Sequence, residues 1–509
     1  MRRRARRAFK SRAALDTTPG DSLQRRRRMA SQANGSPVPE TTIHVAMFPW
    51  FAFGHINPFV QLANKIAAYG VRVSIFSAPG NIPRITSALK SGPGYSTALV
   101  PVHIPPVDGL PPGVESTAEM TPAMAELLKL AVDQMGPQIE ALFAQLRPDI
   151  IVFDFAMQWL PPIAHKHGIK SVFFSIFNAI GIAYLVVPSR LKDGQPPTIE
   201  DLKRPPAGLE IETLPTFKEY ECREFHYVYE SFGGPCAFDR FLACVQGCDA
   251  FLMKTCLEME GPYVKYIESQ YKKPVLLTGP IVPDPPSGEL EERWADWLSR
   301  FPEKSVILCA FGGEVFLKDD QIKELAWGLE MTGEPFILVL KFTENEESRL
   351  KEALPEGFQD KMKERGTVHT DWIPQQLLLA HPNVGYFITH AGSSSIIEGP
   401  INDLQLILLP QRVIQFLITK LLVFNLNAGV EVKRNEDGLF SKDDLCEAVK
   451  AAMASERGGE WRDFLRHREK QEGFIMDLVG KMKEMVIKGF ESRDSVSAVV
   501  HNPVEALET

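Results

Sequence analysis

A histidine and an aspartate stand where two apolar runs of the sequence end. Gly54–His55 follows the run 42–50, and Asp154 lies near the end of the run 149–155. An imidazole beside a buried carboxylate can act as a general base, because the carboxylate orients the ring and stabilises its cation. Taken singly, each residue could equally cap a helix. No G-x-S-x-G pattern occurs, so the nucleophilic serine of a hydrolase triad is not evident.

A second candidate site lies in the stretch FITHAGSSSIIEGP at 387–400, which places His390 and a run of very small residues after an apolar strand. Small residues let a ligand approach the backbone closely. A helix that begins there would turn its free N–H groups and its positive dipole end toward an anion. The stretch therefore indicates a phosphate site around Gly392, with a serine-rich turn that only caps a helix as the alternative.

Short apolar runs alternate with helix-like segments along most of the chain. These elements must position His55, Asp154 and the stretch 387–400. The predicted strands are 42–50, 71–78, 149–155, 171–177, 275–280, 305–313, 335–342, 367–372, 384–392 and 404–410. Continuous apolar strands separated by helices, such as the single helix predicted over 122–146, indicate parallel sheets covered on both faces. Ligands bind beyond the carboxyl ends of such strands. With two sheets, the expected reactive place is the cleft between them.

The order of these elements predicts two domains. A chain of 509 residues is too long for one ordinary core, and the Pro-, Gly- and acid-rich stretch 280–292 is typical of a linker. We expect the following division: a disordered basic leader at 1–40, a first domain at 41–280, a linker at 281–304, a second domain at 305–475, and a C-terminal helical segment at 476–509 that returns to the first domain.

Charge and composition exclude several classes of function. The first 28 residues carry ten Arg and one Lys against two Asp, a net +9 within a chain of net charge −8, so the remaining residues carry −17. Such an acidic body argues against a nucleic-acid partner. The most apolar stretch, 171–188, is broken by Asn178 and Gly181, so no membrane span is expected. Seven cysteines without a C-x-x-C pair favour free thiols and a cytoplasmic location over disulfides or a zinc site.

The segment 372–415 resembles the signature box of plant secondary-product UDP-glycosyltransferases, the family-1 enzymes with two facing Rossmann-like domains of the GT-B type. W-x-P-Q, G-x-F-x-T-H-x-G, S-x-x-E and a terminal Gln follow one another in the order and spacing of that box. The resemblance extends to 311-FGG-313, 321–330 and 54-GHINP-58, and so covers most of 41–500. HAGSSSIIEG followed by LLPQ is most similar to the branch that adds a second sugar to a flavonoid or anthocyanin glycoside.

This resemblance implies a donor site in the second domain, with Trp372 stacked on uracil and Glu398 accepting hydrogen bonds from the ribose. His390 and Ser395, with backbone amides around Gly392, would hold the diphosphate. The full set implied for the UDP-sugar is Gly313, Trp372, Gln375, His390, Gly392, Ser394, Ser395, Glu398, Ile414 and Gln415.

The resemblance also implies an inverting mechanism. His55 would remove a proton from the acceptor hydroxyl while Asp154 stabilises the imidazolium, and the hydroxyl would attack the anomeric carbon as UDP leaves. No Asp-x-Asp pair is placed to hold a divalent ion at the diphosphate, so no metal and no further cofactor are expected. The expected partners are a UDP-sugar and a small glycoside acceptor, bound by a monomer.

The chain departs from the family pattern at two places. The common H-C-G-W-N-S motif reads H-A-G-S-S-S here, where Ser394 can still donate a hydrogen bond in place of Asn. An acidic residue usually precedes the terminal Gln and receives hydrogen bonds from the transferred sugar, but this chain has Ile414–Gln415. We therefore expect a donor other than UDP-glucose, such as UDP-rhamnose or UDP-xylose, or a relaxed preference. A shift of the loop that brings in Arg412 or Gln415 is the alternative.

Two other functions stay open at this point. Ile414 also fits a catalytically impaired protein that binds a UDP-sugar without transferring it. Repeated βα units would equally suit a nicotinamide-dependent oxidoreductase, although no G-x-G-x-x-G follows any predicted strand.

Overall fold

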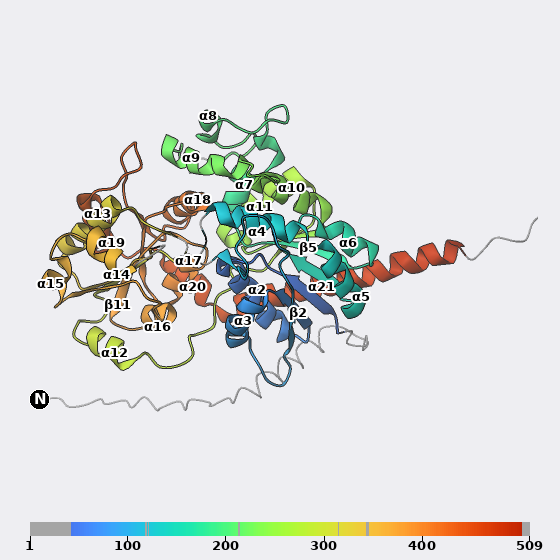
Figure 1. Cartoon of the computed structure of the whole chain (residues 1–509), viewed down its shortest axis with the longest axis horizontal. Helices are drawn as coiled ribbons and strands as arrows, with labels where there is room; N and C mark the ends of the chain where they lie inside the picture. Colours follow the sequence, from blue (N-terminus) through green and yellow to red (C-terminus); the bar gives the residue numbers. More distant parts are fainter. Residues whose placement is uncertain are drawn as a thin grey trace, which may run out of the picture. The chain divides into compact units, whose positions relative to one another are not determined.

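Two parallel sheets organise the chain in the computed structural model (Figure 1). The first has the strand order β3-β2-β1-β4-β5-β6-β7, and the second has the order β10-β9-β8-β11-β12-β13. The predicted α/β class with two doubly wound, Rossmann-like sheets is confirmed. The predicted leader at 1–40 lies outside the described residues, which are 42–117, 120, 122–211, 214–313, 315–342 and 346–500.

The strands are short and mostly buried. Their bounds are β1 His44–Phe48, β2 Arg72–Ser77, β3 Ser96–Pro101, β4 Ile150–Phe153, β5 Lys170–Ser175, β6 Ala250–Met253, β7 Val275–Leu277, β8 Val306–Ala310, β9 Phe336–Val339, β10 Gly366–His369, β11 Val384–Thr389, β12 Gln405–Leu408 and β13 Val430–Glu431. The sequence predicted all of these except β3, β6 and β13. β13 has only two residues and β3 is a half-exposed edge strand, whereas β6, with four residues, is as long as the predicted strands β4 and β9.

Helices connect the strands and cover the sheets. Their bounds are α2 Phe53–Ala67, α3 Ile82–Ala88, α4 Pro122–Asp133, α5 Gly136–Leu146, α6 Leu160–Lys166, α7 Ala179–Leu185, α8 Ile199–Leu202, α9 Glu219–His226, α10 Ala237–Gly247, α11 Leu257–Tyr271, α12 Glu292–Leu298, α13 Asp319–Thr332, α14 Glu346–Ala353, α15 Phe358–Met362, α16 Gln375–Leu379, α17 Ser395–Ile401, α18 Ile414–Lys420, α19 Lys442–Ala454, α20 Gly459–Arg466 and α21 Arg468–Val500.

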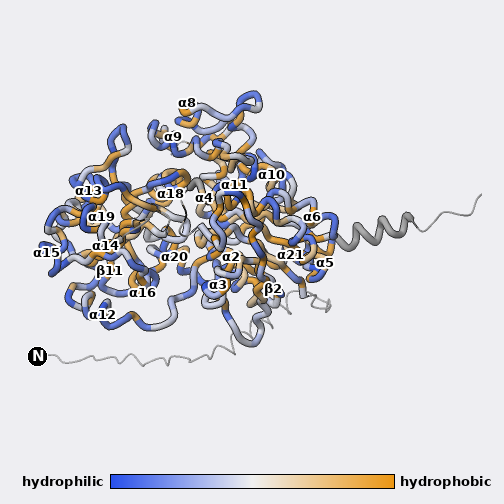
Figure 2. Tube along the Cα trace, viewed as in Figure 1, coloured by the Kyte–Doolittle hydropathy of each residue, from blue (hydrophilic) through white to orange (hydrophobic). Residues whose placement is uncertain are grey.

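The first sheet is apolar on both faces, as the continuous hydrophobic runs predicted. In β1, Ala46 and Phe48 belong to one core cluster, whereas Val45 and Met47 belong to another. This division follows from the alternation of side chains along a strand. Figure 2 shows the hydrophobic residues concentrated in the interior segments and the hydrophilic ones in the outer loops. Because neither face of the sheet is left for solvent, polar chemistry is confined to the ends of the strands.

The prediction of one continuous helix over 122–146 is wrong. The segment forms α4 and α5, which are separated at Gln134–Met135. Pro137 occupies the first turn of α5, where its missing N–H leaves no hydrogen bond unmade. Within a continuous helix, the same proline would remove a hydrogen bond and clash with the preceding turn.

The C-terminal helix α21 packs on the first sheet, although it follows the second sheet in sequence. Its residues Ile475, Leu478 and Met482 share a core cluster with Val45 and Met47 of β1. α21, drawn in red in Figure 1, lies against α2 and β7. The chain therefore crosses between the two sheets twice, once through 281–304, which contains α12, and once at the junction of α20 and α21. Within the described residues, no helix has the length and apolar character needed to cross a membrane.

Candidate active site

The predicted histidine and aspartate meet at the carboxyl ends of two neighbouring strands. His55 lies in the first turn of α2, after β1, and Asp154 directly follows β4, which pairs with β1. His55 Nδ1 lies 2.7 Å from Asp154 Oδ2. The Asp154 carboxylate also accepts hydrogen bonds from the backbone N–H groups of Trp50, at 3.1 Å, and Phe155, at 2.8 Å. These bonds fix a carboxylate that is only 1% exposed.

This contact determines which nitrogen of His55 is available for chemistry. An ionised carboxylate only accepts hydrogen bonds, so Nδ1 carries the proton that points at Asp154. Nε2 then keeps its lone pair and can accept a proton from a substrate hydroxyl. His55 can therefore act as a general base through Nε2, while the Asp154 carboxylate orients the ring through Nδ1.

Aromatic side chains surround the imidazole of His55. The ring of Phe155 lies 5.4 Å from it and the ring of Phe177 lies 5.5 Å from it, centroid to centroid. Phe177 follows β5, the next strand of the sheet. Such a wall provides apolar faces for a planar acceptor, while the few polar groups fix its orientation.

The small residues after β11 make a tight turn around His390. Ala391 has a φ of 63°, and a Cβ atom on Gly392 would lie 2.6 Å from His390 Nε2. A Cβ atom on Gly312 would lie 3.2 Å from His390 Cε1, whereas Gly313 borders open space. The glycines thus make room for an imidazole that is packed directly against the backbone.

Burial lowers the pKa of His390 to about 4, so the ring is neutral near pH 7. A neutral imidazole still carries one N–H that can donate to a phosphate oxygen. Ser394 stands at the N-cap position of α17 without a side-chain capping hydrogen bond, and Ser395 opens the helix. The hydroxyl of Ser394 therefore makes no capping hydrogen bond, although the residue occupies the N-cap position.

The residues assigned to the nucleoside lie beside this turn. Trp372 follows β10 and is 73% exposed, so it is not a core aromatic residue. Glu398 of α17 is 8% exposed. Its carboxylate accepts hydrogen bonds from Gln375 Nε2, at 3.0 Å, and Gln376 Nε2, at 3.4 Å. The tryptophan ring is thus exposed, and the Glu398 carboxylate is held in place by two amides.

Ile414 opens α18 and faces α7 of the first sheet. A Cβ atom on Gly181 would lie 3.1 Å from Ile414 Cγ2. The preceding Val413 has a φ of 33°, which is strained for a β-branched residue. Gln415 Oε1 accepts hydrogen bonds from the backbone N–H groups of Gln411 and Arg412, both at 2.9 Å. The side-chain oxygen of Gln415 therefore stabilises its own loop.

Two polar residues from the first sheet reach the turn after β11. Ser393 Oγ donates to Asn178 Oδ1 at 2.9 Å, and Lys254 Nζ lies 3.5 Å from the Ser393 carbonyl oxygen. Asn178 and Lys254 were missed by the sequence analysis. Both stand just beyond the carboxyl ends of strands, β5 and β6. This position was an available signal for Asn178, because β5 was predicted, but not for Lys254, because β6 was not.

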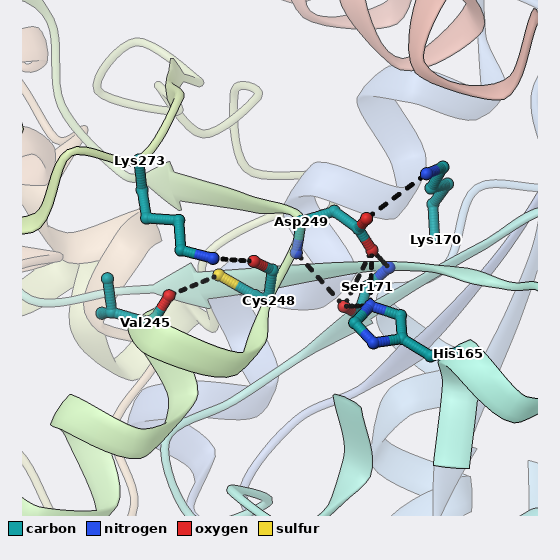
Figure 3. Close-up of polar contacts among 7 residues, drawn as sticks. All are labelled: His165, Lys170, Ser171, Val245, Cys248, Asp249 and Lys273. Atoms are coloured by element: carbon teal, nitrogen blue, oxygen red, sulfur yellow. Dashed lines mark hydrogen bonds and ion pairs between the residues drawn. The ribbon is translucent and has the colours of Figure 1, made fainter. Parts of the chain in front are cut away.

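A separate polar cluster lies at the opposite end of the first sheet. His165 Nε2 lies 3.0 Å from Asp249 Oδ2, and Asp249 also pairs with Lys170 and binds Ser171 (Figure 3). Lys170 begins β5, and Asp249 directly precedes β6. These residues therefore lie at the amino ends of the strands, away from His55 and Asp154.

The cysteines take no part in either site. All seven are buried and free of disulfides, and burial raises the pKa of the Cys248 thiol to about 11. In the described part of the chain, no group of three or more His, Cys, Asp or Glu side chains is arranged to hold a metal ion.

Comparison with known proteins gives consistent matches. The family described as "UDP-glucoronosyl and UDP-glucosyl transferase" matches residues 245–458. The anthocyanidin-3-O-glucoside rhamnosyltransferase of Petunia hybrida is 49% identical over 458 residues, covering 87% of this chain and 96% of the relative. The anthocyanidin 3-O-glucoside 2''-O-glucosyltransferase of Ipomoea purpurea is 40% identical, covering 86% of this chain and 95% of the relative.

A solved structure shows the same fold at low sequence identity. Arabidopsis thaliana UGT89C1 complexed with UDP superposes with a TM-score of 0.67 at 20% identity, covering 87% of this chain and 100% of that one. The similarity supports the arrangement of two α/β halves described above.

Proposed function

Because the chain belongs to the UDP-glucoronosyl and UDP-glucosyl transferase family, it is a UDP-sugar-dependent glycosyltransferase, and we propose that it adds a second sugar to a flavonoid or anthocyanin 3-O-glycoside. The observation that carries this proposal is the 49% identity, over nearly the whole relative, to an enzyme named for rhamnosyl transfer to an anthocyanidin 3-O-glucoside. The oxidoreductase alternative does not fit this family.

The catalytic step uses the pair at the end of β1 and β4. Nε2 of His55 removes the proton of the acceptor hydroxyl, and Asp154 stabilises the imidazolium that forms. The oxygen attacks the anomeric carbon in line, the bond to UDP breaks, and the configuration inverts. The 2.7 Å contact between His55 and Asp154 supports these roles.

The donor lies along the carboxyl end of the second sheet. The uracil stacks on the exposed ring of Trp372, with Gln375 beside the ribose and Glu398 accepting from its hydroxyls. The diphosphate lies against His390, Gly392, Ser394 and Ser395, with Gly313 at its open side, and no metal ion or other cofactor is required. The neutral state of His390 and the uncapped Ser394 support the diphosphate assignment.

We assign the acceptor to residues 41–280 and the donor to residues 305–475, with 281–304 as the linker, and the contacts of Ile475, Leu478 and Met482 with the first core support a C-terminal segment that returns to the first domain. The enzyme acts as a monomer in the cytoplasm. The seven buried, unpaired cysteines suit a reducing compartment.

Incubation of the full-length protein with a panel of UDP-sugars and acceptors tests the function. Mass spectrometry should detect products that carry one added sugar on flavonoid 3-O-glycosides and not on the matching aglycones. The same products should form in EDTA. UDP-sugar binding without transfer to any acceptor would instead favour a catalytically impaired protein.

The donor sugar is assigned from Ile414. An isoleucine cannot accept a hydrogen bond from a sugar hydroxyl, and apolar contacts discriminate weakly between sugars. The more similar of the two relatives above is the one named a rhamnosyltransferase. We therefore assign a donor other than UDP-glucose, with UDP-rhamnose as the first candidate.

Ile414→Asp should raise the ratio of kcat/KM for UDP-glucose over UDP-rhamnose by about tenfold, the change that 1.4 kcal/mol represents. The new carboxylate would accept the hydroxyl that isoleucine leaves unpaired. Ile414→Leu, which keeps an apolar side chain, is the matched control and should leave the ratio unchanged. If the ratio does not move in Ile414→Asp, residue 414 does not face the sugar and serves only to pack against Gly181.

A further inference from the structure

Lys254 carries a buried ammonium group that has no ion-pair partner within 4.0 Å among the described residues. The residue directly follows β6, its backbone N–H donates to Ser175 of β5, and it is only 6% exposed. Its Nζ contacts the Ser393 carbonyl oxygen at 3.5 Å, the long limit of a hydrogen bond. Among the described residues, no carboxylate lies within the 4.0 Å that defines an ion pair with it. Burying a cation without a partner costs free energy, so we expect an anion to bind beside Lys254.

The nearby acids do not supply that anion. Glu260 is fully buried, but its carboxylate accepts from Thr255 Oγ1 at 2.6 Å and from the backbone N–H of Ile180 at 2.8 Å. Glu398 acts on Lys254 only through space and is bound by Gln375 and Gln376. Burial lowers the pKa of Lys254 to about 8, which reflects the lack of a close acidic partner.

The lysine lines a small cavity at the turn proposed to hold the diphosphate. Asn178, Lys254 and Pro280 form one side of this cavity, and Ser393 and Ile396 form the other. Ser393 belongs to the run of small residues between His390 and α17, and the side chains of Asn178 and Lys254 both contact it. Lys254, which follows a strand of the first sheet, therefore places its ammonium next to the turn after β11 of the second sheet, which is proposed to hold the diphosphate.

We propose that Lys254 is a donor-binding residue supplied by the first sheet, and that its ammonium pairs with the diphosphate of the UDP-sugar. This inference rests on the proposed function. It gives the leaving UDP a fixed positive charge in a site for which no metal ion is proposed. As the bond to the sugar breaks, negative charge grows on the diphosphate, and a positioned cation stabilises that charge more in the transition state than in the bound donor.

Calorimetric binding of UDP, UMP and uridine to wild type and to Lys254→Met tests this role. Methionine keeps a similar unbranched shape and removes the charge. Lys254→Met should weaken UDP binding by about tenfold or more, because a charge-assisted contact is lost, and should leave uridine binding unchanged. Lys273→Met is the matched control, since Lys273 also donates to a carbonyl, that of Cys248, far from the turn (Figure 3). This control should bind UDP like wild type.

The pH profile gives a second readout, which a purely structural lysine would not produce. Since the ammonium form predominates below its pKa of about 8, the ratio of wild-type affinities for UDP and uridine, in which the ionisation of the shared uracil cancels, should fall by about tenfold between pH 8 and pH 9.5. The titratable group that acts on Lys254 is Glu398 of α17, and Glu260 of α11 and His390 after β11 are two further titratable groups in buried surroundings. All three remain in Lys254→Met, so the fall should disappear in that variant if it belongs to Lys254.

Two results would overturn the proposal. One is an equal loss of affinity for UDP and uridine in Lys254→Met, which would make Lys254 a structural tether of Ser393. The other is an unchanged UDP affinity together with a wild-type pH profile. Should wild type itself fail to prefer UDP over uridine, the proposed function would fail along with the inference.

Discussion

His55→Ala should abolish sugar transfer while UDP affinity stays nearly unchanged. Removal of a positioned general base typically lowers the rate by ~10²–10⁴-fold. The donor contacts proposed here come from the second sheet and Lys254, so the loss should fall on kcat and not on nucleotide binding. Single-turnover kinetics and UDP calorimetry on the same preparation separate the two quantities.

Asp154→Asn should be impaired as well, with some residual activity. The amide can still contact His55, but it cannot stabilise the imidazolium as a carboxylate does. The chain offers a matched control in His165→Ala, because His165 is also paired with an aspartate, Asp249, at the opposite end of the sheet. That variant should retain full turnover. Near-normal transfer by His55→Ala would exclude the histidine as the base.

Trp372→Ala should weaken the binding of every UDP-sugar to a similar extent. Stacking of a base on an aromatic ring contributes about 1–3 kcal/mol, which corresponds to a loss of about tenfold or more in affinity. Because the ring is 73% exposed, its removal should not lower the melting temperature. Trp327→Ala, at a partly exposed tryptophan of α13, is the control and should bind UDP like wild type.

Glu398→Ala should have a comparable effect on the nucleoside, since it removes the acceptor proposed for the ribose hydroxyls. It also leaves the side-chain amides of Gln375 and Gln376 without their shared partner. Calorimetry with UDP and with uridine should show similar losses for both ligands. Unchanged UDP affinity in both the Trp372 and Glu398 variants would contradict the nucleotide assignment.

The sequence was most informative where a candidate residue lies at or shortly after the end of a predicted apolar strand. His55 and Asp154 are 99 residues apart, yet each stood at the end of a predicted strand, and parallel strands bring such ends to one edge. The signature box likewise singled out Trp372, His390 and Glu398 as candidate donor residues, because its spacing extends over several consecutive elements.

Features that depend on an unpredicted strand or on distant pairs could not be predicted. Lys254 was missed because β6 was not among the predicted strands, so nothing marked Lys254 as a residue at the end of a strand. The bond between Ser393 and Asn178 joins residues 215 positions apart, and nothing in the local sequence of either one points to the other. The sequence showed that Ile414 replaces the acidic residue usual in the family. It could not show that Ile414 packs against Gly181, because this contact joins residues far apart in the chain.

The double crossing of the chain between the sheets limits how the enzyme can open. A single linker would let the two halves swivel freely, whereas the segment 281–304 and the α20–α21 junction attach them at two points. Two attachment points define one line, and rotation about that line is the motion they permit at least cost, as in a hinge. The α20–α21 junction is fixed to the first sheet, because Ile475, Leu478 and Met482 of α21 are buried in the core of that sheet. UDP release should therefore follow a single opening coordinate, along which the Ser393–Asn178 and Ser393–Lys254 contacts break together.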